Sequence, residues 1–314
     1  MIPVLIGGCD RSGTTLLGSL LGNHCECICA PESQFKIEML RYADWMSDDV
    51  DLLHVLSKIK DLFRFKLWDI NIDLEAVPLE KIGSSYKELM IWIVKQYGKK
   101  HGKPNPSMWI DHTPSNTRYA HTLFDFFPEA KMLHIIRDGR AVASSIMRLE
   151  WGPNTINNAA RYWVEKVAYG LAAELCWGDA RVKRVMYEDL AQNPERTLRR
   201  ICYWLNIDYQ SDMIHGNGFV VSPYTKSQHA LVGKEPNFER ANAWKNELTS
   251  RQIEVFENLT GDFLIHLGYR LNYGAKAIPM TKLERRFLRT QETVKRHIIN
   301  RIRHRRRIKK TFLG

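Results

Sequence analysis

The chain has 314 residues, enough for one large domain or two smaller ones around a sizeable core. Its 44% apolar and 26% charged residues are typical of a soluble globular protein. No apolar run reaches the roughly 20 residues that cross a bilayer, and the first predicted strand starts at residue 2. We therefore expect a cytoplasmic protein without a signal peptide or a transmembrane helix.

The net charge of +11 is concentrated at the C-terminal end. Residues 282–314 hold 13 Lys or Arg against two acids, Glu284 and Glu292, and this excess equals the charge of the whole chain. Residues 1–281 are therefore neutral overall. The sequence predicts a neutral globular body followed by a basic tail.

Predicted strands and helices alternate along the chain. We expect strands over 2–6, 108–110, 131–136 and 182–187. After a first helix that follows Thr15, we expect helices over 35–45, 47–64, 85–99, 116–126, 139–148, 155–177, 194–205 and 247–267. Residues 24–31 are expected to form an irregular link and 208–240 an irregular stretch. This order predicts an α/β, P-loop-type three-layer fold with a mostly parallel sheet flanked by helices.

Residues 2–17, IPVLIGGCDRSGTTLL, predict a strand, a glycine-rich loop and a helix. Free backbone N–H groups and the helix dipole make such a turn a phosphate site. Gly8 and Gly13 have the spacing of G-x-x-x-x-G-K-[ST], and Thr15 takes the last position, but Thr14 replaces the lysine. We expect the loop to hold a phosphate without hydrolysing ATP or GTP. The alternative is a plain glycine turn between a core strand and a core helix.

Polar residues follow four of the predicted strands, at 11–15, 111–114, 137–140 and 187–189. Parallel sheets bind ligands at the carboxyl ends of their strands, so we expect these segments to meet. Arg137, with the hydroxyl of Ser145 eight residues later, suits a second phosphate. The alternative is a structural salt bridge from Arg137 to Asp138 or Glu188.

Three segments in order, RSGTTLL (11–17), IIRDGRAVASS (135–145) and VMYEDL (185–190), resemble motifs of the sulfotransferases that use 3′-phosphoadenosine 5′-phosphosulfate (PAPS). The sequence is most similar to the tyrosylprotein sulfotransferase branch and to related bacterial enzymes. The resemblance covers about residues 2–270, so we expect a sulfotransferase domain over 1–275 and a basic amphipathic tail over 276–314. It implies transfer of a sulfuryl group from PAPS to a hydroxyl acceptor: a glycan, a protein tyrosine, or a lipid or small-molecule alcohol.

The resemblance also implies which residues hold the nucleotide. The 5′-phosphosulfate would be held by Arg11, Ser12, Gly13, Thr14 and Thr15. Arg137 and Ser145 would hold the 3′-phosphate, and Tyr187 would contact the nucleotide, unless it is simply a core tyrosine at a strand end. Ser227 and Lys234 resemble a loop that closes over the nucleotide, with ordinary solvated loop residues as the alternative.

Glu32 is the predicted general base. It lies 21 residues after Arg11, in PESQ, where the tyrosylprotein branch has its catalytic glutamate. A carboxylate beside the phosphosulfate can take the proton of the attacking hydroxyl. The alternative is an acidic residue that favours the start of the helix after it.

His112 occupies the place of a lysine that many family members carry in a K-x-P element. A cationic or hydrogen-bonding group there, together with Arg11, would neutralise charge developing on the bridging oxygen. Histidine can fill this role, and because only its protonated form carries charge, activity could depend on pH. Alternatively, His112 is the general base and Glu32 orients the acceptor. No metal is expected, because the acids are scattered and the six cysteines lack metal-site spacing.

Residues 282–310 place large apolar side chains at spacings near three and four among Arg and Lys. This pattern predicts a basic amphipathic helix suited to an anionic membrane surface. The helix could instead pack on the body; nucleic acid is not expected, because binding a polyanion needs no apolar side. Two alternatives to a sulfotransferase stay open: a P-loop kinase-like phosphotransferase, and a non-enzymatic membrane- or polyanion-binding protein. The sequence indicates no oligomeric state.

Overall fold

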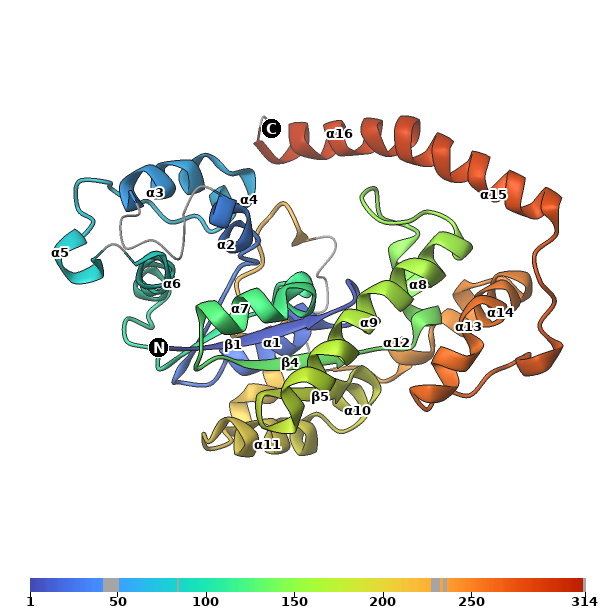
Figure 1. Ribbon diagram of the computed structural model, residues 1–314, viewed down its shortest axis with the longest axis horizontal. Coiled ribbons are helices and arrows are strands. Elements are labelled where there is room, and N and C mark those ends of the chain that lie inside the picture. The colour runs from blue at the N-terminus through green and yellow to red at the C-terminus, as the bar shows by residue number, and fades with distance from the viewer. Residues whose placement is uncertain (42–50, 84, 227–231, 234–235, 313–314) are drawn as a thin grey trace.

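Five parallel strands form the centre of the protein in a computed structural model (Figure 1). The structure describes residues 1–41, 51–83, 85–226, 232–233 and 236–312. The strands are β1 (Ile2–Gly8), β2 (Cys27–Ala30), β3 (Met108–Asp111), β4 (Lys131–Ile136) and β5 (Val182–Met186), in the order β2-β3-β1-β4-β5. The predicted α/β fold with a parallel sheet is confirmed.

Helices cover both faces of the sheet, as the alternation of elements predicts. Leu5 of β1 packs in a core with Leu89 and Phe127, whereas its neighbour Ile6 packs in another with Leu20. Successive side chains of a strand point to opposite faces, so β1 serves two cores at once. The helices up to β5 are α1 (Thr14–Gly22), α2 (Phe35–Glu38), α3 (Leu52–Asp61), α4 (Phe63–Lys66), α5 (Leu79–Ile82), α6 (Tyr86–Lys100), α7 (Ala120–Phe126), α8 (Gly139–Ile146) and α9 (Ile156–Arg181).

A third core joins α8 and α9 to the helices that follow the sheet. These later helices are α10 (Tyr187–Gln192), α11 (Pro194–Leu205), α12 (Glu239–Asn242), α13 (Trp244–Glu247), α14 (Ser250–His266), α15 (Lys282–Val294) and α16 (Asn300–Phe312). The helix expected over 47–64 is divided, because Leu62 is extended between α3 and α4. Its first residues, 47–50, and the end of the helix expected over 35–45 lie outside the described residues.

The prediction of an irregular link over 24–31 is wrong, because β2 forms there. Its four residues, CICA, are buried on both faces and pair with β3 from Cys27↔Met108 to Ala30↔Asp111. A short strand buried on both faces shows no polar–apolar alternation, so periodicity could not reveal it. The strand matters for function because Glu32 follows its carboxyl end.

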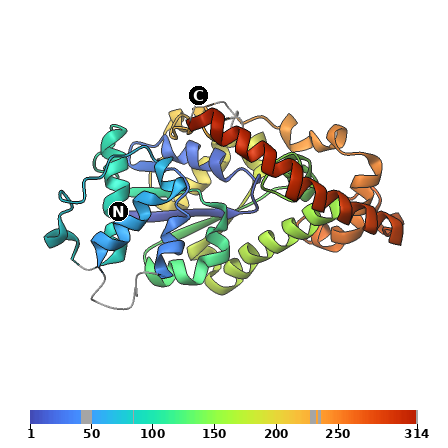
Figure 2. The same cartoon turned by 90° about the horizontal axis from the view of Figure 1, so that it is seen from above.

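A long helix crosses over the body at the C-terminal end, as two perpendicular views show (Figures 1 and 2). It consists of α15, a π-helical turn (Lys295–Ile299) and α16. We call this unit, residues 282–312, the terminal helix. The predicted helix over 282–310 is confirmed, while the division of the chain at residue 275 stays a prediction.

Candidate active site

The loop between β1 and α1 has the geometry of an anion site. Gly13, with a φ of 102°, immediately precedes α1, and no side chain caps the helix. A Cβ at Gly13 would come within 2.7 Å of the Tyr187 ring, so the loop and this ring fit only with glycine. Ser12 is fully buried, and its Oγ has no hydrogen-bond partner among the described residues. These features leave donors at a helix N-terminus for a phosphate.

Arg11 connects this loop to the second predicted phosphate site. Its backbone is left-handed, with a φ of 70°, and its Nε donates to Ser145 Oγ at 3.1 Å. Burial, reinforced by the charge of Arg137, lowers the pKa of Arg11. The residues predicted to hold the two phosphate groups are therefore neighbours, although 134 positions separate Arg11 from Ser145.

Arg137 follows β4 and holds the loop in place. Its Nη1 donates to the Arg11 carbonyl at 3.0 Å and its Nη2 to the Arg240 carbonyl at 2.8 Å. The guanidinium lies 4.3 Å from the centroid of the Tyr187 ring. Its Nε is buried and has no partner in the described part of the chain. Both acceptors of these hydrogen bonds are neutral carbonyl oxygens, so no carboxylate among the described residues balances its positive charge.

The alternative, a structural salt bridge from Arg137, does not form among the described residues. Asp138 pairs instead with Arg140, at 2.7 Å, and Arg140 also binds Glu257. Glu188 accepts hydrogen bonds from the backbone N–H of Asp138 and from the Tyr269 hydroxyl. Arg140 therefore fills the structural role that the sequence left open for Arg137.

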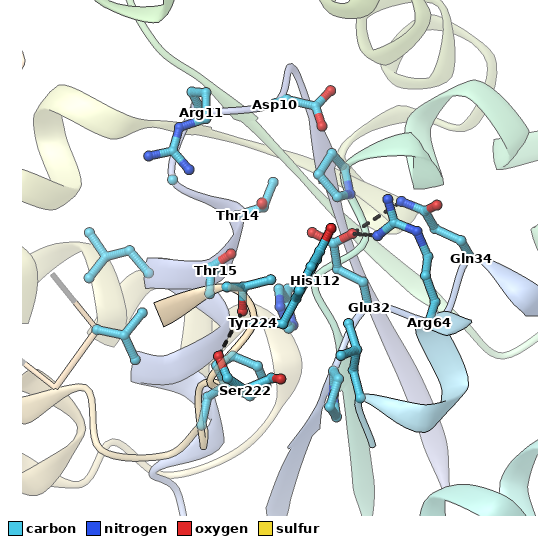
Figure 3. A pocket seen from close by; sticks show the side chains of 18 of the residues that line it. Asp10, Arg11, Thr14, Thr15, Glu32, Gln34, Arg64, His112, Ser222 and Tyr224 are labelled. Carbon is cyan, nitrogen blue, oxygen red and sulfur yellow. Dashed lines mark hydrogen bonds and ion pairs between the residues drawn. The ribbon is translucent and has the colours of Figure 1, made fainter. Parts of the chain in front are cut away.

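Glu32 enters the same cavity from the end of β2 (Figure 3). Its Oε2 accepts hydrogen bonds from Arg64 Nη1 and Gln34 Nε2, both at 3.1 Å. The side chain keeps 25% of its surface exposed, but the surrounding protein shields it from bulk solvent. This burial raises the pKa of Glu32 to about 7, against the opposing effects of Arg64 and Gln34.

A buried ion pair fixes the segment that carries Glu32. Lys36 Nζ lies 2.7 Å from Asp111 Oδ2, and Ser33 Oγ donates to the same oxygen at 2.7 Å. The Ser33 backbone N–H also donates to Thr113 Oγ1. Burial alone would raise the pKa of Asp111, but Lys36 and the hydrogen bonds from the Thr113 and Ser33 hydroxyls outweigh it and lower the pKa. The sequence did not predict this link, since no local pattern joins residue 36 to residue 111.

His112 lies at the end of β3 and is 2% exposed. Its Nδ1 is 3.5 Å from Cys29 Sγ, and its ring packs against Phe219. Burial lowers the pKa of His112 to about 4, so the ring is neutral near pH 7. Of the forms that the sequence left open, this favours the neutral one: a neutral ring can donate a hydrogen bond or take a proton, but it supplies no positive charge.

A cavity of about 650 Å³ joins most of the predicted site residues. It is lined by Arg11, Gly13, Thr14, Thr15, Glu32, His112, Arg137 and Tyr187. Ser12 and Ser145 are not among its lining residues, and Ser145 reaches the cavity through its bond to Arg11. Ser227 and Lys234 lie outside the described residues.

The opposite side of the cavity was not predicted. It is lined by Phe63, Arg64 and Leu67 near α4, by Trp151, by Phe219 and Tyr224, and by His304 and Arg307 of α16. These residues share no local motif, so only the tertiary structure assembles them. The expected irregular stretch over 208–240 supplies Phe219, Tyr224 and Arg240 to the site.

Within the described ranges, no cluster of His, Cys, Asp or Glu could hold a metal ion. The same ranges contain no helix whose length and apolar character would let it cross a membrane.

Known proteins resemble this chain in sequence or in fold. Residues 3–211 match the model of the sulfotransferase family. A protein-tyrosine sulfotransferase of Drosophila melanogaster is 24% identical over 280 residues, 85% of this chain and 51% of that protein, so the chain spans about half the length of this relative. The sulfotransferase domain of the Synechococcus PCC 7002 olefin synthase has 22% identity and a TM-score of 0.58, covering 86% of this chain and 95% of that domain. A sulfotransferase domain from the curacin biosynthetic pathway has 17% identity and a TM-score of 0.56, covering 86% and 98%.

The two solved domains have the fold of this chain, and the curated relative comes from the branch that the motifs predicted. Because the family model matches well over half of the chain, this protein belongs to the sulfotransferase family, as its sequence predicted.

Proposed function

We propose that the protein transfers a sulfuryl group from PAPS to a hydroxyl-bearing acceptor. The acceptor oxygen attacks sulfur, and the bond between sulfur and the bridging oxygen of the 5′-phosphate breaks. The products are a sulfate ester, 3′-phosphoadenosine 5′-phosphate (PAP) and a proton, which Glu32 accepts. The observation that carries the proposal is that Glu32 and the loop at the start of α1 line one cavity.

In this proposal, Arg11 to Thr15 bind the 5′-phosphosulfate and Arg137 with Ser145 binds the 3′-phosphate. The N–H groups at the start of α1 and the cavity-lining Gly13, Thr14 and Thr15 support the first role. Among the described residues, Arg137 has no carboxylate partner and its Nε has no hydrogen bond, which supports the second role. Tyr187 stacks on Arg137 and fixes its position beside Gly13.

Glu32 acts as the general base. A pKa of about 7 leaves much of the carboxylate ionised at neutral pH while keeping it basic enough to take a proton. Among the described residues, the hydrogen bonds from Arg64 and Gln34 both go to Oε2, which leaves Oε1 for the acceptor hydroxyl. Neutral His112 donates a hydrogen bond to the bridging oxygen, and Arg11 supplies the positive charge there.

The test is calorimetry with PAP, ATP and AMP, followed by transfer from labelled PAPS. We expect PAP to bind most tightly, because it alone presents a phosphate to Arg137 as well as one to the loop. A preference for ATP with magnesium would instead indicate the phosphotransferase that the sequence left open.

We also propose that residues 282–310 bind an anionic membrane surface and place the enzyme at the periphery of a membrane. Each basic residue near an anionic leaflet contributes about 1 kcal/mol, and the apolar side chains of the same segment add to this. Sedimentation of the full chain with phosphatidylserine vesicles at low salt tests the proposal, and a chain that stays in the supernatant overturns it.

A further inference from the structure

The terminal helix docks on the body through polar side chains. Glu292 accepts a hydrogen bond from Thr155 Oγ1 at 2.8 Å, and Glu284 pairs with Arg251 at 2.8 Å. The buried Asn300 donates to Asn154 Oδ1 at 2.7 Å. The helix is therefore held by specific polar contacts along its length, while Leu288 packs against the third core.

Near its end, the terminal helix becomes part of the cavity wall. Arg307 pairs with Glu150 at 2.8 Å, its guanidinium carbon lies 4.2 Å from the centroid of the Tyr224 ring, and it donates to the Tyr224 hydroxyl. The Tyr224 ring packs edge-on against Phe63 at 4.9 Å. Phe63, Tyr224, Arg307 and Trp151, which follows Glu150, all line the cavity. We call these four residues the outer wall.

A separate side of the same helix exposes large apolar residues to solvent. Five of them are 41% to 79% exposed: Leu283, Phe287, Val294, Ile298 and Ile302. Their spacings of four, seven, four and four residues place them along one side, which we call the apolar edge. Trp151 of the outer wall is also 45% exposed. Exposed apolar residues gathered along one helix indicate an interaction surface.

Charge decides what covers this edge. The terminal segment carries 13 Lys or Arg against two acids, so a second copy would bring two strongly basic helices together. An anionic polymer would neutralise the charge and leave the apolar edge in water. An anionic membrane accommodates both the positive charge and the apolar edge, because its headgroups meet the cations and its acyl region takes the apolar side chains.

We propose that the apolar edge inserts into an anionic membrane, that this holds the outer wall at the membrane surface, and that the acceptor is the hydroxyl group of a membrane-resident amphiphile. The proposal rests on the proposed sulfuryl transfer and specifies its acceptor class. The aromatic side chains of Phe63, Tyr224 and Trp151, which line the cavity, suit a molecule with an apolar body. Glu32 lines the same cavity and pairs with Arg64, where the polar head would arrive.

Binding is tested with full-length protein and phosphatidylcholine vesicles with or without phosphatidylserine. The variant F287S/I298S removes two residues of the apolar edge, and L175S/Y203S removes two still more exposed apolar residues from α9 and α11 as a control. We expect vesicle affinity to fall about tenfold or more in the first variant and to be unchanged in the second. Equal loss in both, or in neither, overturns the membrane contact.

Orientation is tested with brominated lipids, which quench nearby tryptophans. Comparison of the protein with W151F isolates the signal of Trp151, and we expect that signal to be quenched on anionic vesicles. A protein that binds vesicles while Trp151 keeps its fluorescence would overturn the placement of the outer wall at the membrane.

The acceptor class is tested with labelled PAPS, a glycolipid-rich extract in anionic vesicles, and the water-soluble headgroups released from the same extract. We expect label in the lipid fraction, with at least tenfold less on the free headgroups and less lipid labelling by F287S/I298S. Label mainly on free headgroups, or on neither pool, overturns the amphiphile acceptor. PAP binding by calorimetry reports separately on the nucleotide site, so failure of the acceptor proposal is distinguishable from failure of the proposed function.

Discussion

The nucleotide half and the outer wall of one cavity are built in different ways. The nucleotide half comes from the ends of parallel strands: the loop after β1, Arg137 after β4 and Tyr187 after β5. The outer wall comes from segments that are not strand ends: Phe63 of α4, Trp151 after α8, Tyr224, and Arg307 of α16. The first half is fixed by the sheet, whereas the second is assembled from segments distant in sequence.

This difference explains which half can vary. At Gly13, even a methyl group would collide with the Tyr187 ring, so the backbone of the nucleotide half tolerates little change. The outer wall depends on side-chain contacts such as Arg307 with Glu150, which other residues could replace. A rigid nucleotide site beside an adaptable wall lets one chemistry serve different acceptors.

The largest difference between an effect on turnover and an effect on nucleotide binding is expected from Glu32→Gln, which keeps the shape of the side chain and removes its basicity. Turnover should fall by roughly 10²–10⁴-fold, the usual contribution of a general base, while PAP affinity stays the same. Turnover of labelled PAPS and calorimetry measure the two effects. Glu38→Gln, at an exposed residue of α2, is the matched control. If Glu32→Gln turned over normally, His112 would become the candidate base.

A smaller effect, confined to the nucleotide half, is expected from Arg137→Ala. Loss of a hydrogen bond to a charged group costs about 1.5–3 kcal/mol, so PAP should bind roughly 10- to 150-fold more weakly. Adenosine 5′-phosphosulfate, which lacks the 3′-phosphate, should lose much less affinity, because only the contact between Arg137 and the loop carbonyl of Arg11 is removed for it. Arg199→Ala, at an exposed ion pair on α11, is the control for calorimetry. Equal losses for both nucleotides would contradict the assigned role.

The smallest effect concerns the boundary between the halves, where Arg64 of α4 contacts Glu32. Arg64 lowers the pKa of Glu32, so Arg64→Gln should raise that pKa above about 7. Only ionised Glu32 accepts a proton, so the acid limb of kcat/KM against pH should move to higher pH. The shift should be about one unit or less, because Arg64 is 49% exposed. Lys66→Gln is the control. An acid limb that stays in place or moves to lower pH would show that Arg64 does not lower the pKa of the catalytic base.

The sequence predicted the half of the site in which backbone geometry and residue type coincide. The loop at 11–15 was predictable because glycines and hydroxyls at fixed spacing produce its shape, and Arg137 because it ends the most apolar strand. Glu32 required the family resemblance, since the strand before it, β2, is too short and too buried to show a period. The charge of His112 could not be predicted, because burial, which the sequence did not reveal, lowers its pKa.

The outer wall could not be predicted for a different reason. Tyr224 and Arg307 meet although 83 residues separate them, and each looks like an ordinary loop or tail residue in its own segment. The buried pair of Lys36 and Asp111 is similar, since its energy comes from a contact that no local pattern encodes. Such contacts form only when complete helices and strands pack together, so the sequence of one segment does not reveal them.

The π-helical turn sets how far α16 is rotated about the helix axis relative to α15. Lys295 and Asn300 are five residues apart and both contact Asn154, in keeping with a turn that holds more residues than the usual 3.6 or so. Without the additional residue, α16 would be turned by roughly 100° about its own axis relative to α15. Arg307 would then swing away from Glu150 and Tyr224 while Glu284 and Glu292 stayed in place. The additional residue in the π-helical turn thus determines whether α16 brings Arg307 to the cavity wall.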